Sequence, residues 1–272
     1  MYKILFIDID GTLLTSQHLI SKGTLSAIQR ISEIKKIPVI LTSARPPQAV
    51  EKIYKQLNLN SPIVCFNGAL ILEKYNNNGF THLLSSTVDI AYLNVINRNA
   101  IENNLSVNFY EMGKWFSNSY TNWINQEEEI TETKVTILNT HLQIQQWTTE
   151  NEGPHKILLM GDPGKIDSTE LQIIKHAGHH LNIYKSKPTY LEITNGAASK
   201  VSAIIFLLKK YGLASKDVLA IGDNYNDIEM LKLAGLGIAM GNSPDEVKSQ
   251  ARFITLDNDS EGIKFALDMF IN

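Results

Sequence analysis

Short apolar runs alternate with helix-like segments at the start of the chain, and this order restricts the fold more than any other feature of the sequence. Apolar runs occur at residues 3–9 (KILFIDI), 37–42 (IPVILT) and 62–71 (PIVCFNGALI). Between them lie two helix-like segments, residues 21–36 and 47–58. Strands that alternate with helices in this way predict a parallel sheet with right-handed crossover connections.

The same pattern returns at the end of the chain, whereas the middle has a different texture. Residues 199–212 predict an amphipathic helix, and the strand-like run DVLAIGD follows at residues 217–223. From about residue 83 to about residue 188 asparagine and glutamine become frequent, and all three tryptophans occur. We expect an α/β protein whose core domain, residues 1–82 and 189–272, is a doubly wound, Rossmann-like parallel sheet, with an inserted α+β domain at residues 83–188.

The composition argues against several classes of protein. The 272-residue chain has a formal net charge of −3 and no block of lysine or arginine, which argues against nucleic-acid binding. No apolar run approaches the roughly 20 residues that a membrane span requires. The single cysteine, Cys65, fits a reducing compartment. We therefore expect a cytoplasmic protein without a nucleic-acid or membrane partner.

Two aspartates interrupt the apolar N-terminal strand. Asp8 and Asp10 lie in a run expected to be buried on both faces, where an unpaired carboxylate is strongly disfavoured. Asp223 follows the apolar run VLAIG in the same way, and Asp227 lies one turn further along. If the two strands are parallel neighbours, these carboxylates crowd together, and a hard divalent cation is the simplest way to neutralise them. An all-oxygen ligand set without a histidine or cysteine cluster favours Mg²⁺ over zinc.

A Mg²⁺ site of this kind predicts a phosphate ester as the substrate, because the ion retains water and shares phosphate oxygens. One carboxylate can attack phosphorus and form an aspartyl phosphate that water later hydrolyses. A second carboxylate, two residues further on, can protonate the leaving alcohol and then deprotonate the water. Thr42 and Lys200 are candidate donors to the phosphoryl oxygens, and Arg45 and Asn67 are candidates for contact with the substrate.

Four motifs resemble those of the haloacid dehalogenase superfamily: DIDGTLLT, the threonine in LTSARP, the lysine in SKVSAI, and GDNYNDIEML. CFNGALI, AMGNSPDEVKSQA and NDSEGI extend the resemblance to the Cof-type subfamily, whose members carry a C2-type cap domain between the second and third motifs. The resemblance implies a phosphomonoester hydrolase in which Asp8 is the nucleophile and Asp10 the general acid and base. Thr42 and Lys200 match its phosphate-holding positions, although Thr42 is followed by Ser-Ala-Arg where the family has Gly-Arg.

The resemblance also implies a set of ligands and a substrate class. The implied magnesium ligands are Asp8, the backbone carbonyl of Asp10 and Asp223, with Asn226 and Asp227 at the metal or just behind it. The implied substrate is a small phosphorylated metabolite such as a sugar phosphate. The residues expected to bind its phosphate or the rest of the substrate are Thr42, Ser43, Arg45, Asn67, Gly68, Lys200 and Asn226.

Several alternatives stay open at this point. A phosphotransferase or phosphomutase would use a sugar hydroxyl as the second acceptor, and a non-catalytic phosphate-sensing module would use Asp8 without fast turnover. Asp227 can lie near the metal or serve only as an N-terminal helix carboxylate that the helix dipole favours. His176, His179 and His180 have a spacing compatible with metal binding. We favour surface or structural roles for them, because they lie in the expected cap, away from the carboxylates.

Overall fold

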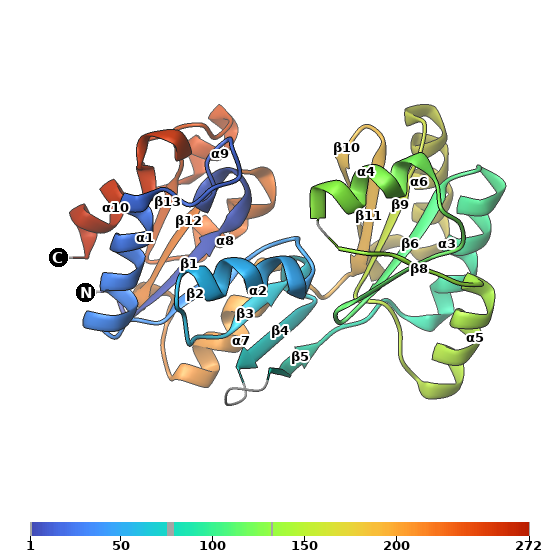
Figure 1. Cartoon of the computed structure of the whole chain (residues 1–272), viewed down its shortest axis with the longest axis horizontal. Coiled ribbons are helices and arrows are strands. Elements are labelled where there is room, and N and C mark those ends of the chain that lie inside the picture. The colour runs from blue at the N-terminus through green and yellow to red at the C-terminus, as the bar shows by residue number, and fades with distance from the viewer. Residues whose placement is uncertain (1, 75–78, 132, 272) are drawn as a thin grey trace. The chain divides into compact units, whose positions relative to one another are not determined.

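The computed structural model describes residues 2–74, 79–131 and 133–271. The chain forms two compact units, each with its own sheet (Figure 1). The first unit consists of Met1–Arg45, Val50–Leu83 and Ser199–Asn272. The second unit consists of Leu84–Ala198 together with Pro46–Ala49.

The first unit is built on an eight-stranded sheet in the order β14-β13-β12-β1-β2-β3-β4-β5. Neighbours from β14 to β3 pair in parallel, whereas β4 is antiparallel to β3. All five residues of the central strand β1 are buried, which explains why this run is apolar up to its last residue. The strands are β1 (Ile4–Asp8), β2 (Val39–Thr42), β3 (Ile63–Cys65), β4 (Leu70–Lys74), β5 (Phe80–Ser85), β12 (Val218–Gly222), β13 (Leu236–Ala239) and β14 (Phe253–Ile254).

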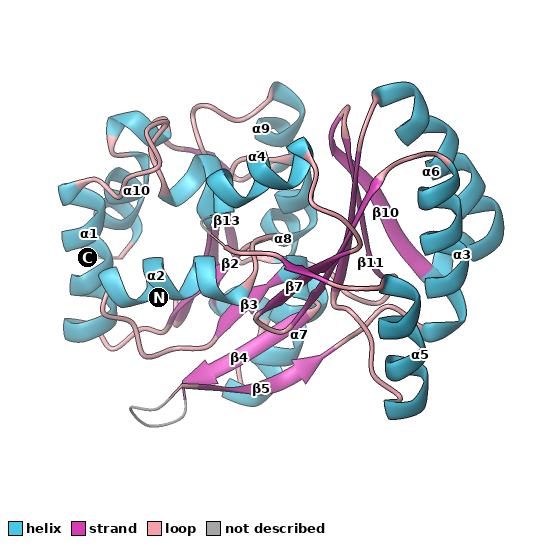
Figure 2. Ribbon diagram, turned by 45° about the vertical axis from the view of Figure 1, so that its right-hand side comes forward, coloured by secondary structure: helices cyan, strands magenta, loops and turns pink. Residues whose placement is uncertain are grey.

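Helices flank this sheet, as Figure 2 shows. Of these, α1 packs against α10, and α7 packs against α8. The helices are α1 (Lys22–Gln29), α2 (Pro47–Gln56), α7 (Lys200–Tyr211), α8 (Ile228–Leu233), α9 (Asp245–Gln250) and α10 (Gly262–Phe270). The order of strands and crossover helices is that of a doubly wound sheet.

The caps of α7 fix the position of Lys200. The hydroxyl of Ser199 accepts a hydrogen bond from the N–H of Ser202, and the hydroxyl of Ser202 accepts one from the N–H of Ser199. Gly212 ends the helix in the left-handed conformation, with a φ of 65°. Because this capping box sets where the helix begins, Lys200 is its first residue.

The apolar run at residues 62–71 forms two strands instead of one. β3 ends at Cys65, and β4 returns antiparallel from Leu70. The turn between them, Phe66–Gly68, has positive φ angles of 51°, 53° and 101°. A Cβ at Gly68 would collide with the carbonyl of Ser199, so this position requires glycine.

The second unit has a six-stranded sheet in the order β10-β11-β9-β6-β7-β8, antiparallel except between β7 and β8. Its strands are β6 (Ser106–Glu111), β7 (Lys114–Ser117), β8 (Thr136–Ile137), β9 (Lys156–Met160), β10 (Leu181–Lys187) and β11 (Tyr190–Asn195). Its helices are α3 (Ile90–Glu102), α4 (Asn122–Thr131), α5 (Thr140–Glu150) and α6 (Pro163–Ala177). Trp147 lies in the core of this unit, with its ring edge-on to Phe109 at 5.4 Å between centroids.

The predicted fold class is confirmed, because the first unit has the doubly wound parallel sheet and the second unit combines a sheet with helices. The second unit extends to Ala198 and not to the expected residue 188, because β11 pairs with β9 and β10 in its sheet. Within the described ranges, no helix is long and apolar enough to cross a membrane.

Candidate active site

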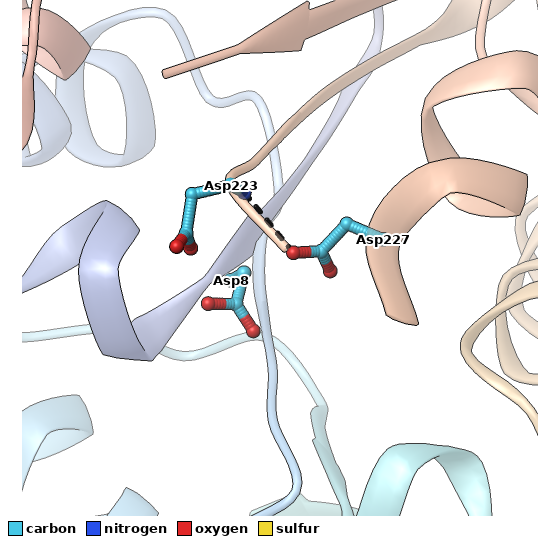
Figure 3. Close-up of side chains that lie close together, drawn as sticks. All are labelled: Asp8, Asp223 and Asp227. Atoms are coloured by element: carbon cyan, nitrogen blue, oxygen red, sulfur yellow. Dashed lines mark hydrogen bonds between the residues drawn. The ribbon is translucent and has the colours of Figure 1, made fainter. Parts of the chain in front are cut away.

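Two carboxylates lie at the ends of neighbouring central strands. Asp8 is the last residue of β1, and Asp223 directly follows β12. Because β1 and β12 pair in parallel, their carboxyl ends meet at the same edge of the sheet. Asp227, at the end of the turn η6 (Tyr225–Asp227), lies beside them (Figure 3). One oxygen of each carboxylate lies within 4.8 Å of the others, and no other group of this kind occurs in the described part of the chain.

Lys200 lies among these carboxylates as their counter-ion. Its Nζ donates hydrogen bonds to Oδ1 of Asp8 at 2.5 Å and to Oδ1 of Asp227 at 2.6 Å. The lysine side chain is only 1% exposed. A buried cation in the first turn of a helix is disfavoured both by desolvation and by the helix dipole. The two carboxylates compensate for this, and they hold the ammonium beside Asp8.

Both oxygens of Asp227 are engaged by hydrogen-bond donors. Oδ2 accepts hydrogen bonds from the backbone N–H groups of Asp223 and Asn224, each at 3.1 Å, while Oδ1 accepts from Lys200. The residue is fully buried. Asp227 therefore fixes the backbone at Asp223 and the ammonium of Lys200, and its oxygens are less available to a metal than those of Asp8 and Asp223.

The turn η1 (Ile9–Leu13) contributes Thr12, which is not among the residues expected at the site. The hydroxyl of Thr12 donates a hydrogen bond to Oδ1 of Asp223 at 2.6 Å. Gly11 has a φ of 76°, and a Cβ there would collide with the carboxylate of Asp223. The Gly-Thr pair that follows Asp10 is the sequence signal for this contact, since it joins a left-handed position to a hydroxyl.

The ionisable groups of the site carry an excess of negative charge. Three carboxylates face one ammonium, which leaves two negative charges when all four groups are ionised. Burial, with added repulsion from Asp227 and Asp223, raises the pKa of Asp8 well above its usual value despite the opposing charge of Lys200. Burial likewise raises the pKa of Asp223 to about 6.

The donor set fits a hard divalent cation. Burial alone would lower the pKa of Lys200, but Asp227 and Asp8 outweigh it and raise that pKa, so the lysine stays charged. When all four groups are ionised, the net charge of −2 equals in size the positive charge of one divalent cation, which would neutralise it. The candidate ligand atoms are carboxylate oxygens, which Mg²⁺ prefers over nitrogen or sulfur.

The carboxylate of Asp10 does not belong to this group of three. Its carboxylate forms a bidentate ion pair with Arg45, with Nε 2.8 Å from Oδ2 and Nη2 2.5 Å from Oδ1. About half of the Asp10 side chain, 51%, is exposed. Arg45, predicted to contact the substrate, thus contacts Asp10 in this structure, and Asp10 lies where it can exchange protons with water.

Thr42 and Ser43 differ in what their hydroxyl groups contact. The hydroxyl of Thr42 is buried against the carbonyl of Ile7 at 3.5 Å and the sulfur of Met230 at 3.8 Å. The hydroxyl of Ser43 accepts a hydrogen bond from the N–H of Arg45 at 3.1 Å. Thr42 is a residue expected to hold the phosphate, yet its hydroxyl lies against Ile7 and Met230 at the end of β2.

The remaining predicted residues lie on two turns of the first unit. Asn226, in η6, donates a hydrogen bond from Nδ2 to Oδ1 of Asn67 at 3.2 Å. Asn67 has a φ of 53°, and its N–H donates to the carbonyl of Ser43 at 2.8 Å. Gly68 follows it against Ser199. The structure therefore joins these turns to the segment that carries Ser43, and Asn226 contacts Asn67.

The histidines of the second unit do not form a metal cluster. The rings of His179 and His180 stack with their centroids 4.5 Å apart, and Tyr92 stacks on His180 at 5.9 Å. Nδ1 of His176 lies 2.7 Å from the carbonyl of Gln172. None of the three belongs to a group of metal-ligating side chains among the residues that the structure describes.

Comparison with known proteins places this fold and site in a family. The sequence profile of the haloacid dehalogenase-like hydrolases matches residues 5–267. The chain belongs to this family, and the expected resemblance is confirmed.

Individual relatives match over nearly the whole length. A putative phosphatase of Haemophilus influenzae is 34% identical over 270 residues, which is 98% of each chain. A pyridoxal phosphate phosphatase of Escherichia coli is 28% identical over 274 residues, which is 96% of each chain. The crystal structure of a haloacid dehalogenase-like hydrolase from Bacteroides thetaiotaomicron shares 27% identity with a TM-score of 0.89 and covers 100% of both chains. These relatives support classing the protein as a phosphatase.

Proposed function

We propose that this protein is a Mg²⁺-dependent phosphomonoester hydrolase that works through an aspartyl phosphate on Asp8. The observation that carries this proposal is the buried contact of Asp8 with Lys200 next to Asp223, at the carboxyl ends of β1 and β12. A phosphate dianion placed there meets a nucleophilic carboxylate, an ammonium and a candidate cation site at once.

The reaction uses Asp8 and Asp10 in two steps. A carboxylate oxygen of Asp8 attacks phosphorus, the bond from phosphorus to the ester oxygen breaks, and Asp10 donates a proton to the leaving oxygen. Asp10 then accepts a proton from a water molecule, whose oxygen attacks phosphorus. The bond between phosphorus and Asp8 breaks, which releases inorganic phosphate and restores both carboxyl groups. The exposed side chain of Asp10 suits this exchange with alcohol and water.

Lys200 and Ser43 are the proposed donors to the phosphoryl oxygens. An ammonium has three N–H donors, and Lys200 directs two of them to Asp8 and Asp227. Ser43 accepts from the N–H of Arg45, and among the described residues its hydroxyl donates to no other group. Ser43 therefore replaces Thr42 in this role, because the hydroxyl of Thr42 faces Ile7 and Met230.

Asp8, the backbone carbonyl of Asp10 and Asp223 are the proposed ligands of Mg²⁺. When bound, the ion would polarise the phosphoryl oxygens and balance the excess negative charge of the site. Thr12 orients the carboxylate of Asp223 through its hydrogen bond. Asp227 holds Lys200 and the backbone at Asp223, so we assign it to the support of the site instead of to direct ligation.

The proposed substrate is a small phosphorylated metabolite such as a sugar phosphate. The relative from Escherichia coli is named for pyridoxal phosphate, which is a phosphomonoester of this size class. A charge of about −2 on such a phosphate suits Lys200 and a bound cation. Transfer to water and not to a second alcohol is part of the proposal, so free inorganic phosphate is the expected product.

Replacing Asp8 by Asn tests the nucleophile. The variant keeps the size and part of the hydrogen bonding of the side chain but cannot attack phosphorus, so we expect turnover of p-nitrophenyl phosphate to fall by at least about 10³-fold. Exposed Asp162, replaced by Asn, is the matched control and should keep its activity. Release of phosphate from a panel of phosphorylated metabolites, with Mg²⁺ and with EDTA, gives the substrate class. Turnover retained by Asp8→Asn would refute the assignment.

A further inference from the structure

Two motifs near the C-terminus, GNSPDEV and NDSEGI, play no part in the proposed reaction, yet they reach the turn that carries Asp10. Asn242, in the first motif, donates a hydrogen bond from Nδ2 to the backbone carbonyl of Gly11 at 2.9 Å. The two residues are 231 positions apart in the chain. Gly11 directly follows Asp10, so this bond attaches to the backbone next to the proposed acid and base.

Asn258, in the second motif, supports Asn242 and holds the end of the same turn. Its N–H donates to Oδ1 of Asn242 at 3.0 Å, and its own Nδ2 donates to the carbonyl of Leu14 at 2.8 Å. We call these two residues, Asn242 and Asn258, the asparagine bracket. The bracket therefore binds the turn at the carbonyls of Gly11 and Leu14, which lie on either side of Thr12 and Leu13.

The turn η1 needs such support because its backbone is not regular. Asp10 has a ψ of 122° and Gly11 a φ of 76°, both outside the helical region. Glycine has the widest conformational freedom of any residue, so its peptide is poorly fixed by local sterics. Within the turn, the N–H of Leu14 donates to the carbonyl of Ile9 at 3.0 Å. Asn242 adds a hydrogen bond from a distant segment to the carbonyl of Gly11, in the peptide between Gly11 and Thr12.

We infer that Asn242 and Asn258 are positioning residues for proton transfer by Asp10. The inference rests on the proposed function, in which Asp10 protonates the leaving oxygen. Neither asparagine is placed at the substrate, since both act on the backbone that carries Asp10. A shift of the peptide at Gly11 moves the carboxyl group of Asp10 relative to Asp8, and the geometry of proton transfer depends steeply on such a shift.

A positioning role for Asn242 can be distinguished from a role in stability by which quantity its loss changes. Asn242 is exposed, and an exposed hydrogen bond competes with water, so its loss changes the free energy of unfolding little. A positioning role instead weakens one chemical step. Because Asp10 assists the departure of the alcohol, the step most affected is the loss of a poor leaving group, such as unsubstituted phenolate.

The test compares kcat/KM for phenyl phosphate and for p-nitrophenyl phosphate in Asn242→Ala. Nitrophenolate leaves with little protonation, whereas phenolate needs the acid. We expect kcat/KM for phenyl phosphate to fall about tenfold and that for p-nitrophenyl phosphate less than about threefold. Asn103→Ala is the matched control, because Nδ2 of Asn103 also donates to a backbone carbonyl at 2.9 Å, that of Asn99 in the second unit. Asn258→Ala gives the same comparison if Asn242→Ala does not fold.

Asp10→Asn separates the failure of this inference from failure of the proposed function. Asp10→Asn should show the same preference for nitrophenolate in stronger form, and Asn242→Ala should add nothing to it in the double variant. If Asp10→Asn itself shows no preference between the two leaving groups, the proposed role of Asp10 is wrong, and this inference falls with it. If Asp10→Asn shows the preference but Asn242→Ala loses activity equally on both substrates, the asparagine bracket is structural only.

Discussion

Single residues in the site differ mainly in which of their atoms already have partners. Both oxygens of Asp227 accept hydrogen bonds, whereas Asp8 and Asp223 each have one oxygen that accepts none from the described residues. Thr42 and Ser43 are both buried, but the hydroxyl of Thr42 contacts Ile7 and Met230, whereas that of Ser43 accepts from the N–H of Arg45. These differences assign roles to residues of the same chemical type, which composition and spacing leave equivalent.

A pair of substitutions tests the choice between the two hydroxyls. Ser43→Ala removes a proposed donor to the phosphoryl oxygens, and we expect kcat/KM to fall by about 10²-fold, the loss typical of one such donor. Thr42→Val keeps the shape of the buried side chain and removes a long contact of 3.5 Å to Ile7, so its loss should be much smaller. Both are measured with p-nitrophenyl phosphate under saturating Mg²⁺. A larger loss in Thr42→Val than in Ser43→Ala would restore Thr42 as the phosphate contact.

At the scale of elements, the first helix depends on a residue from the other end of the chain. Ser21 caps α1 through the N–H of Thr24. The carboxylate of Glu261 then accepts hydrogen bonds from the hydroxyls of Ser21 and Thr24 and from the N–H of Gly23. A carboxylate at a helix N-terminus also interacts favourably with the helix dipole. Glu261 thereby joins the start of α1 to the segment just before α10.

Glu261→Gln tests this contact through the pH dependence of stability. Burial opposes the charge, but the hydrogen bonds from Ser21, Thr24 and Gly23 outweigh it and lower the pKa of Glu261 below 4.5. A lowered pKa stabilises the folded state above the unfolded pKa, and this stabilisation disappears as pH falls through the folded value. We expect Glu261→Gln to lose about 1 kcal/mol of unfolding free energy at pH 7 and little at pH 3. Equal losses at the two pH values, in urea titrations, would contradict the charge effect.

Secondary structure follows from sequence where one local pattern decides it. The segment 199–212 was predicted as a helix, and α7 begins and ends where Ser199 and Gly212 place it. The run at residues 62–71 is typical of one strand, because its apolar character continues through Phe66 without a clear break. Its division into β3 and β4 depends on three consecutive positive φ angles and on the approach of Gly68 to Ser199, a residue that lies far along the chain.

On the scale of the whole molecule, both ends of the chain contribute strands to one sheet. The negative charges of the site lie at the carboxyl ends of its central strands. β1 and β12 are neighbours although the second unit lies between them in the sequence. Folding must therefore bring Asp8, Asp223 and Asp227 together against their mutual repulsion, with Lys200 as the compensating charge. A cation that binds only the folded chain should increase its stability.

Added Mg²⁺ is expected to raise the melting temperature of the full chain. Binding at about 100 times the dissociation constant contributes about 2.7 kcal/mol, which corresponds to a rise of roughly 5 °C or more for a domain of this size. EDTA should reverse the rise, and NaCl at matched ionic strength should not reproduce it. Asp223→Asn keeps an oxygen that can accept from Thr12 but loses the charge, so the rise should vanish. The same rise in Asp223→Asn would place the cation elsewhere.

The sequence by itself determined the class of fold and the family, and it marked Asp8, Asp223, Asp227 and Lys200, which the structure brings together. Apolar runs, helical spacing and polar strand ends are local properties, and a few residues such as Asp8, Asp10 and Asp223 mark the carboxyl ends of strands. Tertiary structure decided which atoms of these residues meet. Lys200 and Asp8 are 192 positions apart, and only the pairing of β1 with β12 and the caps of α7 bring them to 2.5 Å.

The partners of Thr42, Thr12 and Asn242 were decided in the same way. Each depends on a group contributed by a distant segment: Met230 for Thr42, Asp223 for Thr12, and Gly11 for Asn242. The extent of the second unit to Ala198 also depends on which sheet β11 joins. A hydrogen bond acts over about 3 Å, and the local sequence does not determine which distant atom comes within that reach.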